Sequence, residues 1–191
     1  MSMSSNDIAN QALMLVGDNA PMVSGVAPTW DTSPAGLALA QIYVPTVQAV
    51  QREFNWDASR RWIALVATGN SPPFFAGYTG EYLYPSNGIE VWEVQERILV
   101  DLNDPLPTQF TGGNTLVNGV QTKVIWTSVP SPYVTYNNSP NESTWDAGFT
   151  EAVVRALASK LALAIAGRPE TSALMGQTSQ KAIAIDKTRN A

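Results

Sequence analysis

Apolar side chains recur at helical spacing in four stretches of the chain: residues 4–16, 33–54, 145–166 and, more weakly, 169–191. Local signals mark where these stretches begin and end. Ser4 and Asp7 have the spacing of a helix cap, and Gly17 stands where the first helix should stop. Ser33 followed by Pro34 is typical of a helix start. The sequence therefore predicts about four helices.

Two of these helices carry features that constrain how they pack. Pro45 lies inside the second helical stretch, where it should kink the helix or split off its first turns because it lacks an N–H. In the third stretch the polar residues Glu151, Arg155 and Ser159 form one narrow stripe among Ala, Val, Leu and Ile. We expect this helix to be enclosed on most sides.

Between the second and third helical stretches, β-branched and aromatic residues cluster in short runs that end at turn signals. These runs predict strands at residues 62–67, 82–84, 89–94, 98–100, 115–117, 120–126 and 133–136. Asn118-Gly119 between two of the runs predicts a hairpin with a type I′ turn. Gly112-Gly113 predicts another turn, because no Gly-Lys-Ser/Thr follows to make a phosphate loop.

The predicted fold class is α+β. Residues 1–60 and 144–191 should form a helical body of about four helices with a C-terminal docking segment. Residues 61–143 should form a small antiparallel β-rich insert between the second and third helices, as a sheet, sandwich or open barrel.

Charge is sparse and unevenly distributed. Charged residues make up 14% of the 191 residues, against about 25% in typical globular chains. This low fraction suggests that other subunits cover part of the surface. The net charge of −5 disfavours an autonomous nucleic-acid binder. Three basic and seven acidic residues give the insert a charge of −4, whereas four basic and two acidic residues give residues 168–191 a charge of +2.

The residue types needed for common active sites are missing. The chain contains no cysteine and no histidine, which removes the commonest zinc ligands, the usual general base and the usual catalytic triads. Glu90, Glu93 and Glu96 form the densest acidic group. Strand residues three positions apart point to opposite faces, so these carboxylates should not converge as a glycosidase pair. We therefore predict no enzyme, no catalytic residue, no cofactor and no metal site; a carboxylate-based hydrolase is the third alternative.

Two groups of aromatic residues are candidates for binding. Trp56, Arg60 and Arg61 combine the residue types that dominate interface hot spots, so we interpret them as a subunit contact or as an anchor of the junction between helix and insert. Stacking on nucleic acid by Arg60-Arg61 beside Trp56 and Trp62 is the less favoured interpretation. Trp92 and Trp126 belong to a set of insert aromatics that a carbohydrate-binding module could use, provided that both rings are exposed and coplanar.

No membrane or secretory signal is expected. The first residues lack a basic start followed by an apolar run, and the most apolar stretch, Leu161 to Ala166, is far shorter than the roughly 20 residues of a membrane span. The sequence predicts a soluble protein that is intracellular at synthesis.

The order of several short strings resembles the head-to-tail adaptor family of tailed bacteriophages, which includes tail tubular protein A of short-tailed phages. The resemblance extends over about residues 5–175. In the helical stretches, the strings are Asn10-Gln-Ala-Leu13 with Val16-Gly17, Tyr43-Val-Pro45 to Phe54-Asn-Trp56, and Phe149 to Leu161-Ala162. In the insert, they are Arg60-Arg61 with Leu65, Tyr82-Leu-Tyr-Pro85 before Ile89 to Val94, and Val134-Thr-Tyr136.

This resemblance implies a virion protein of the phage neck or tail, made in the cytoplasm of the bacterial host. Its copies would form a ring, commonly of twelve, beneath the capsid portal, with the next tail or nozzle protein on the other side. Double-stranded DNA would pass through the lumen, which an acidic chain favours because like charges do not adhere. Lys181, Lys187 and Arg189 would then be candidates for docking on the portal protein. Another neck or tail-completion protein is the nearest alternative.

Overall fold

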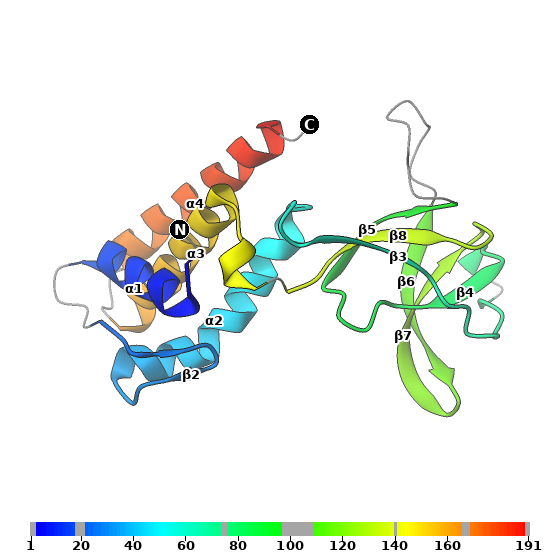
Figure 1. Ribbon diagram of the computed structural model, residues 1–191, viewed down its shortest axis with the longest axis horizontal. Coiled ribbons are helices and arrows are strands. Elements are labelled where there is room, and N and C mark those ends of the chain that lie inside the picture. Colours follow the sequence, from blue (N-terminus) through cyan, green and yellow to red (C-terminus); the bar gives the residue numbers. More distant parts are fainter. Residues whose placement is uncertain are drawn as a thin grey trace. The chain divides into compact units, whose positions relative to one another are not determined.

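The computed structural model describes residues 3–17, 22–73, 76–96, 109–139, 141–165 and 169–189. Figure 1 shows their elements in chain order: α1 (Ser5–Val16), β1 (Gly25–Val26), β2 (Thr29–Trp30), α2 (Pro34–Glu53), β3 (Arg60–Ala64), β4 (Gly80–Leu83), β5 (Glu90–Gln95), β6 (Phe110–Val117), β7 (Val120–Thr127), β8 (Tyr133–Asn137), α3 (Ala147–Ala164) and α4 (Pro169–Arg189). The chain divides into a helical unit, Met1–Ala58 with Pro140–Ala191, and a β unit, Ser59–Ser139.

The starts of α1 and α2 follow from their capping residues. The Ser4 side chain accepts a hydrogen bond from the Asp7 backbone N–H (3.2 Å), and the Asp7 carboxylate accepts one from the Ser4 backbone N–H (2.9 Å). The hydrogen bonds from Ser4 lower the pKa of Asp7. The Ser33 hydroxyl accepts from the Gly36 N–H (3.1 Å) at the start of α2. Both predicted helix starts are confirmed.

Helix α2 continues through Pro45, so of the two predicted outcomes, a kink or a split, the split is wrong. The Thr46 side chain stabilises the helical turn at this position. Its hydroxyl donates a hydrogen bond to the Ile42 carbonyl (2.6 Å) and accepts one from Lys160 Nζ of α3 (2.8 Å). Thr46 is buried, and its contacts hold α2 and α3 together where proline removes a backbone hydrogen bond.

Helix α3 is the centre of the helical unit and packs against α1, α2 and α4. It starts at Ala147 with Asp146 as its cap, a little later than the sequence predicts. Phe149, Leu157 and Leu161 are fully buried, and the alanines among them let neighbouring backbones approach closely. The expected enclosure of this helix is confirmed by its run of buried positions. Pro169 begins α4, as predicted.

The strands form three separate antiparallel sheets, so the prediction of one small β-rich insert between the second and third helices is wrong. One two-stranded sheet, β1-β2, precedes α2, where the sequence predicts no strand. The other two have the orders β3-β8-β5 and β4-β7-β6. Local patterns missed this division because strand pairing depends on partners far apart in the chain, such as β3 and β8.

The segment that begins with β3 passes from one three-stranded sheet to the other. β3 pairs with β8 of the first sheet, and just after β3 the Leu65 N–H donates to the Pro132 carbonyl, which precedes β8 (2.8 Å). The Val66 carbonyl then accepts from the Leu83 N–H of β4 (2.8 Å). A small apolar core fills the β unit; its buried members are Val91, Val94, Ile125, Val129, Val134 and Tyr136.

The β6-β7 hairpin confirms one turn prediction and corrects another. Asn118 and Gly119 have φ angles of 51° and 79°, as a type I′ turn requires, and Val117 pairs with Val120. Gly112 and Gly113 do not form a turn, because both lie inside β6. The predicted strand at residues 98–100 lies outside the described residues.

The position of Gly113 in a strand has a steric reason. A Cβ there would overlap the Trp126 ring of the neighbouring strand β7, whereas a Cβ on Gly112 would meet nothing within 4 Å. Gly113 therefore leaves the space that the indole needs, a contact between strands that local turn propensity does not reveal.

Candidate interaction surfaces

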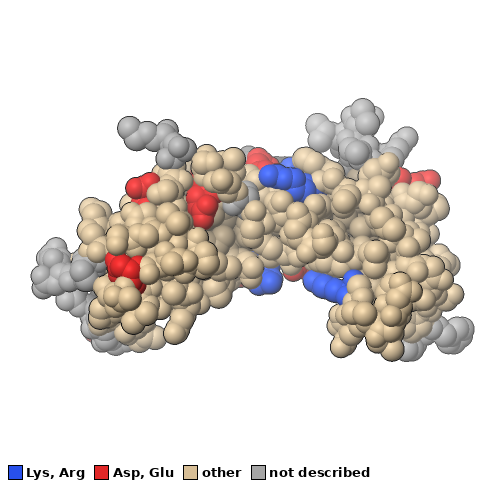
Figure 2. All heavy atoms as spheres, turned by 60° about the horizontal axis from the view of Figure 1, so that its bottom comes forward, with Lys and Arg blue, Asp and Glu red and all other residues tan. Residues whose placement is uncertain are grey.

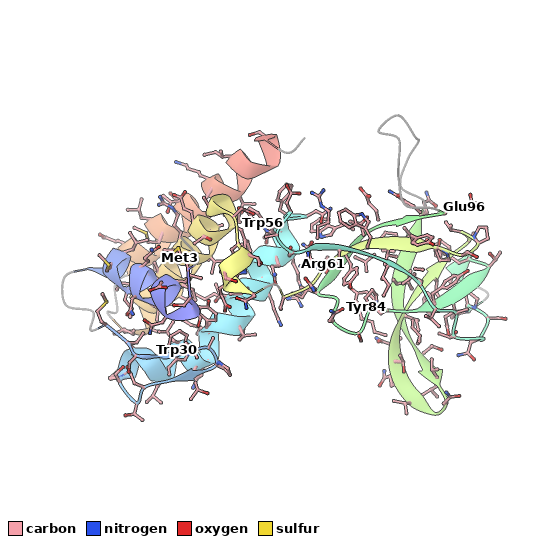
Figure 3. The ribbon with its side chains drawn as sticks, in the orientation of Figure 1. Met3, Trp30, Trp56, Arg61, Tyr84 and Glu96 are labelled. Atoms are coloured by element: carbon pink, nitrogen blue, oxygen red, sulfur yellow. The ribbon has the colours of Figure 1, made fainter. Side chains whose placement is uncertain are left out.

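Trp56 belongs to the core of the helical unit. It is fully buried, and its Nε1 donates to the Val50 carbonyl (2.9 Å). Its ring centroid lies 5.1 Å from those of Phe54 and Phe149. Figure 3 shows Trp56 among the side chains of this unit. This burial is suited to an anchoring role and leaves no ring surface for a contact with another subunit.

Arg60 and Arg61 begin β3, an edge strand of its sheet. Arg61 is exposed, and its Nη1 donates to the Arg60 carbonyl (2.7 Å); Figure 3 labels its position. Trp62, which follows on the same strand, is 55% exposed, and Ile63 and Val66 are also exposed. The structure therefore places the two arginines next to the exposed Trp62 ring, which belongs to the less favoured stacking interpretation, whereas Trp56 of that interpretation is buried.

A β-bulge in β5 rearranges the acidic residues of the β unit. Glu90 lies opposite Asn137 of β8. Glu93 lies opposite Thr135, because Trp92 is an extra residue in β5. Since Asn137 and Thr135 are two positions apart, Glu90 and Glu93 share one face of the sheet. The expectation that these carboxylates point to opposite faces is wrong, and no local pattern in the sequence marks the bulge.

Trp92 and Trp126 do not form one aromatic platform. They lie on strands of different sheets, and both are half-buried. The Trp126 Nε1 donates to Glu81 Oε2 (2.8 Å). Two further donors reach the other oxygen of Glu81, from the Thr68 hydroxyl (2.8 Å) and the Asn70 amide (3.1 Å). Glu81 is only 2% exposed, so a buried carboxylate on β4 connects β7 with the segment of Thr68 and Asn70.

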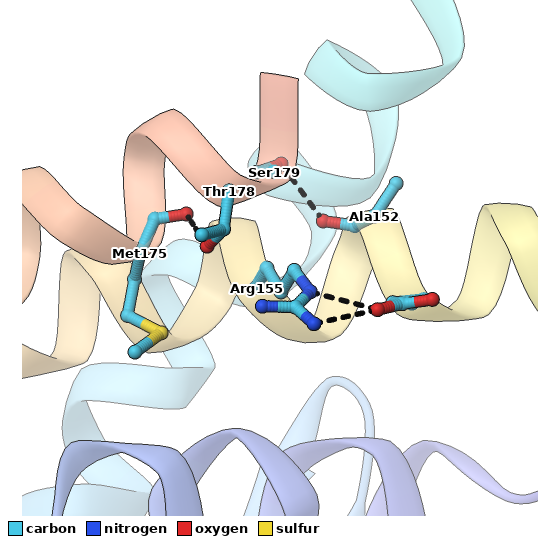
Figure 4. A network of polar contacts seen from close by, with 6 residues as sticks. Ala152, Arg155, Met175, Thr178 and Ser179 are labelled. Atoms are coloured by element: carbon cyan, nitrogen blue, oxygen red, sulfur yellow. Dashed lines mark hydrogen bonds and ion pairs between the residues drawn. The ribbon is translucent and has the colours of Figure 1, made fainter. Parts of the chain in front are cut away.

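Lys181 lines a pocket of about 380 Å³ between α3 and α4. Glu151 and Arg155 of α3 lie in the same pocket and form an ion pair (2.6 Å). Figure 4 shows this pair beside the contact in which the Ser179 hydroxyl of α4 donates to the Ala152 carbonyl of α3 (3.1 Å). Lys181 is exposed. The side chains of the other two predicted docking residues, Lys187 and Arg189, lie outside the described residues.

A second pocket, of about 370 Å³, lies in the helical unit beside α1 and the start of α3. Its apolar lining comes from Met3, Trp145 and Val154, and its acidic lining from Glu142 and Glu151. We call it the α1–α3 pocket. The sequence did not indicate it, because its lining comes from segments that are more than a hundred residues apart.

Large apolar side chains are exposed on every helix of the helical unit. They are Met14 and Leu15 on α1, Leu37 and Val44 on α2, Leu163 on α3, and Leu174 and Ile185 on α4. In the face drawn in Figure 2, acidic and basic residues form only small separate groups on a mostly uncharged surface.

Within the described ranges, no three acidic side chains lie close enough together to hold a metal ion. Nor does any helix in this part of the chain combine the length and apolarity that crossing a membrane requires.

No protein-family model matches the chain, and a comparison with curated proteins gives no significant match either.

Proposed function

We propose that this protein is a non-enzymatic structural component of a phage virion. It acts as a head-to-tail adaptor whose copies form a ring beneath the capsid portal. The observation that carries the proposal is the presence of exposed large apolar side chains on all four helices of the helical unit. Single exposed apolar residues are ordinary on a monomer, but here they recur on each helix in a chain with few charges.

A subunit of a ring has a neighbour on each of two sides, so it needs apolar surface in more than one direction. Helices α1 and α2 expose such residues, and α3 and α4 expose others, such as Leu163 and Ile185. Copies that cover these side chains would remove them from water. This requirement supports an assembly of many copies over a free monomer.

The charge of the chain supports passage of double-stranded DNA through the ring. The net charge is −5, and an acidic lumen would repel the phosphate backbone enough to prevent adhesion. The absence of histidine and cysteine from the sequence supports a structural role over a catalytic one.

Helix α4 is the part of the subunit that would dock on the portal protein. Lys181 is exposed on it, and Lys187 and Arg189 follow in the sequence. Positive charge on α4 would guide the subunit to an acidic surface of the portal protein. The next tail or nozzle protein would bind the opposite side of the ring.

Electron microscopy of the purified protein mixed with portal protein tests the proposal directly. We expect a ring of defined copy number attached to the portal, and a chain truncated after Met175 should lose this attachment. Full-length protein that binds an assembled tail but never the portal would contradict the adaptor function and favour another neck or tail-completion protein.

A further inference from the structure

Asparagine is followed by glycine at two places in the chain, Asn87-Gly88 and Asn118-Gly119. Asparagine is one of the thermolabile residues, because the backbone nitrogen that follows it can attack its side-chain amide carbon. A glycine favours this attack, since it brings no side chain of its own and leaves the backbone free to turn. The two pairs therefore share one intrinsic reactivity, and the structure around each pair decides whether it reacts.

Asn87 lies in a turn that is bonded to its surroundings. The Gly88 N–H, whose nitrogen would be the attacking atom, donates to the Pro85 carbonyl (2.9 Å). The Asn87 Oδ1 accepts from the hydroxyl of Tyr136, which belongs to the core of the β unit (3.3 Å). A Cβ on Gly88 would lie 3.0 Å from the Tyr84 ring, so the turn is also closely packed. The Gly88 nitrogen reaches the Asn87 amide only if these contacts break.

Asn118 lies in a turn without such restraints. Both turn residues, Asn118 and Gly119, are exposed, and a Cβ on Gly119 would meet nothing within 4 Å. Among the described residues, neither the Asn118 side chain nor the Gly119 N–H forms a hydrogen bond. The turn is fixed by the pairing of Val117 with Val120 on either side of it. The reactivity of Asn118 therefore depends on how firmly the end of the hairpin is held.

The end of the β6-β7 hairpin extends beyond the strand that supports its base, as Figure 1 shows. β4 pairs with β7 only as far as Val124. Among the described strands, residues 115–122 pair only with each other. A ribbon of two strands is marginally stable in water, and Leu116 and Val120 near its tip are 66% and 65% exposed. This end of the hairpin should therefore open more readily than its base.

We propose that Asn118 is a site of spontaneous deamidation, and that opening of the hairpin end admits the reaction. The Gly119 nitrogen bonds to the Asn118 Cγ, and its proton leaves with the side-chain nitrogen as ammonia. The product is a succinimide ring. Water then adds to one of the two ring carbonyls and breaks the bond between that carbon and the Gly119 nitrogen. Cleavage at Cγ gives aspartate, and cleavage at the backbone carbonyl carbon gives isoaspartate.

Both products change the tip of the hairpin. Each gains a carboxylate at a position that lies between the exposed Leu116 and Val120 in the sequence. Isoaspartate also leads the backbone through Cβ and Cγ, which adds one carbon to a two-residue turn of type I′ geometry. The pairing of Val117 with Val120 should then loosen. The reaction needs only this chain and water, so the inference does not depend on the proposed function.

The second Asn-Gly pair provides an internal control. The full chain is kept in heavy-oxygen water at mildly alkaline pH, where the backbone nitrogen loses its proton more readily, and is digested at intervals for peptide mass spectrometry. Heavy oxygen marks molecules that reacted before the digestion. We expect Asn118 to react faster than Asn87 in the folded chain by about tenfold or more, since its turn opens more often. In urea, where both turns are unfolded, the two rates should be similar.

A reversible cross-link tests the need for opening, in a chain that has no cysteine of its own. The Leu116 carbonyl accepts from the Asn70 amide (3.3 Å) and so points away from β7. Leu116 and Gln121 therefore face each other without mutual backbone hydrogen bonds, the kind of pair in which side chains lie closest. In the double variant Leu116→Cys with Gln121→Cys, the closed disulfide should slow the reaction of Asn118 by about tenfold or more and leave Asn87 unchanged. Reduction should restore the rate.

Three results would overturn the inference. Asn87 could react as fast as Asn118 in the folded chain, Asn118 could stay intact in the folded chain while it reacts in urea, or the closed disulfide could leave the rate at Asn118 unchanged. None of these measurements involves the portal protein, so the adaptor function stands or fails separately.

Discussion

The two units of the molecule are stabilised in different ways. In the helical unit one large apolar cluster joins all four helices around α3. In the β unit the apolar core is small, and a buried carboxylate, Glu81, with three hydrogen-bond donors lies at the junction of several segments. Burial of apolar area therefore dominates in the first unit, and directional bonds and steric fit carry more of the stability in the second. The following changes test this contrast.

The largest effect is expected from Trp56→Ala, which empties the centre of the helical core. The ring packs against Phe54 and Phe149, and its N–H is bonded to Val50. We expect a loss of about 3–5 kcal/mol in the free energy of unfolding, from the cavity and the lost bond. Urea denaturation followed by far-ultraviolet circular dichroism measures it. Trp62→Ala, at an exposed position on β3, is the control and should change stability by less than about 1 kcal/mol.

Glu81→Ala should have the next largest effect, and it should be confined to the β unit. The substitution leaves the Trp126 N–H, the Thr68 hydroxyl and the Asn70 amide without their shared acceptor. We expect a loss of about 2–3 kcal/mol, since the Glu81 carboxylate is buried and donors left unpaired at partly buried positions are costly. Hydrogen exchange with mass spectrometry should show faster exchange in β4, β6 and β7 but not in α3. The exposed Glu96→Ala is the matched control, and equal exchange in both variants would contradict the role of Glu81.

Substitutions of the two adjacent glycines of β6 distinguish the effect of steric fit on stability from the effect of strand propensity. Gly113→Ala should destabilise the β unit by about 1–2 kcal/mol, because the new methyl group overlaps the Trp126 ring. Gly112→Ala should be neutral or slightly stabilising, because the position is open. Urea midpoints of the two variants measure the difference. Similar midpoints would mean that Trp126 shifts easily and does not need the glycine.

The smallest effect on stability is expected from Asp31, whose carboxylate connects Ser24, before β1, with Ser33 at the start of α2. The Asp31 carboxylate accepts hydrogen bonds from Ser33 and Ser24, which lower its pKa from 3.8 to about 2. Because the folded state holds the proton less tightly, this contribution to stability is present above pH 4 and is lost as the pH falls through 2. Asp31→Asn should therefore show a smaller loss of stability between pH 4 and pH 2 than the unchanged chain. Urea midpoints at both pH values measure it, with Glu96→Gln as the charge control.

The helix starts were predictable because their signals are local. Ser4 and Ser33 each bond to a backbone N–H three residues ahead, and such spacing is visible in the sequence. The Asn118-Gly119 turn is local in the same way. The division into three sheets, the place of Gly113 and the bulge at Trp92 were not predictable, because each depends on a strand that lies elsewhere in the chain.

The candidate surfaces also depend partly on local signals and partly on residues that lie far apart in the sequence. Trp56 could be recognised as an anchor by its residue type, but its burial depends on Phe149, more than ninety residues later. The exposure of Leu116 and Val120 at the tip of the β6-β7 hairpin was missed because both look like ordinary strand residues. The α1–α3 pocket had no local signal, because Met3 and Glu142 of its lining lie far apart in the sequence.

The discontinuity of the helical unit has a consequence for the order of synthesis. Helices α1 and α2 leave the ribosome first, and more than ninety residues separate Glu53 from Ala147, where α3 begins. At about 5–20 residues per second, the apolar side chains of α1 and α2 wait roughly 5–20 seconds for α3 to cover them. The β unit is one continuous segment, so it can fold within that interval. Each nascent chain therefore carries a finished β unit and an open helical surface until α3 and α4 emerge.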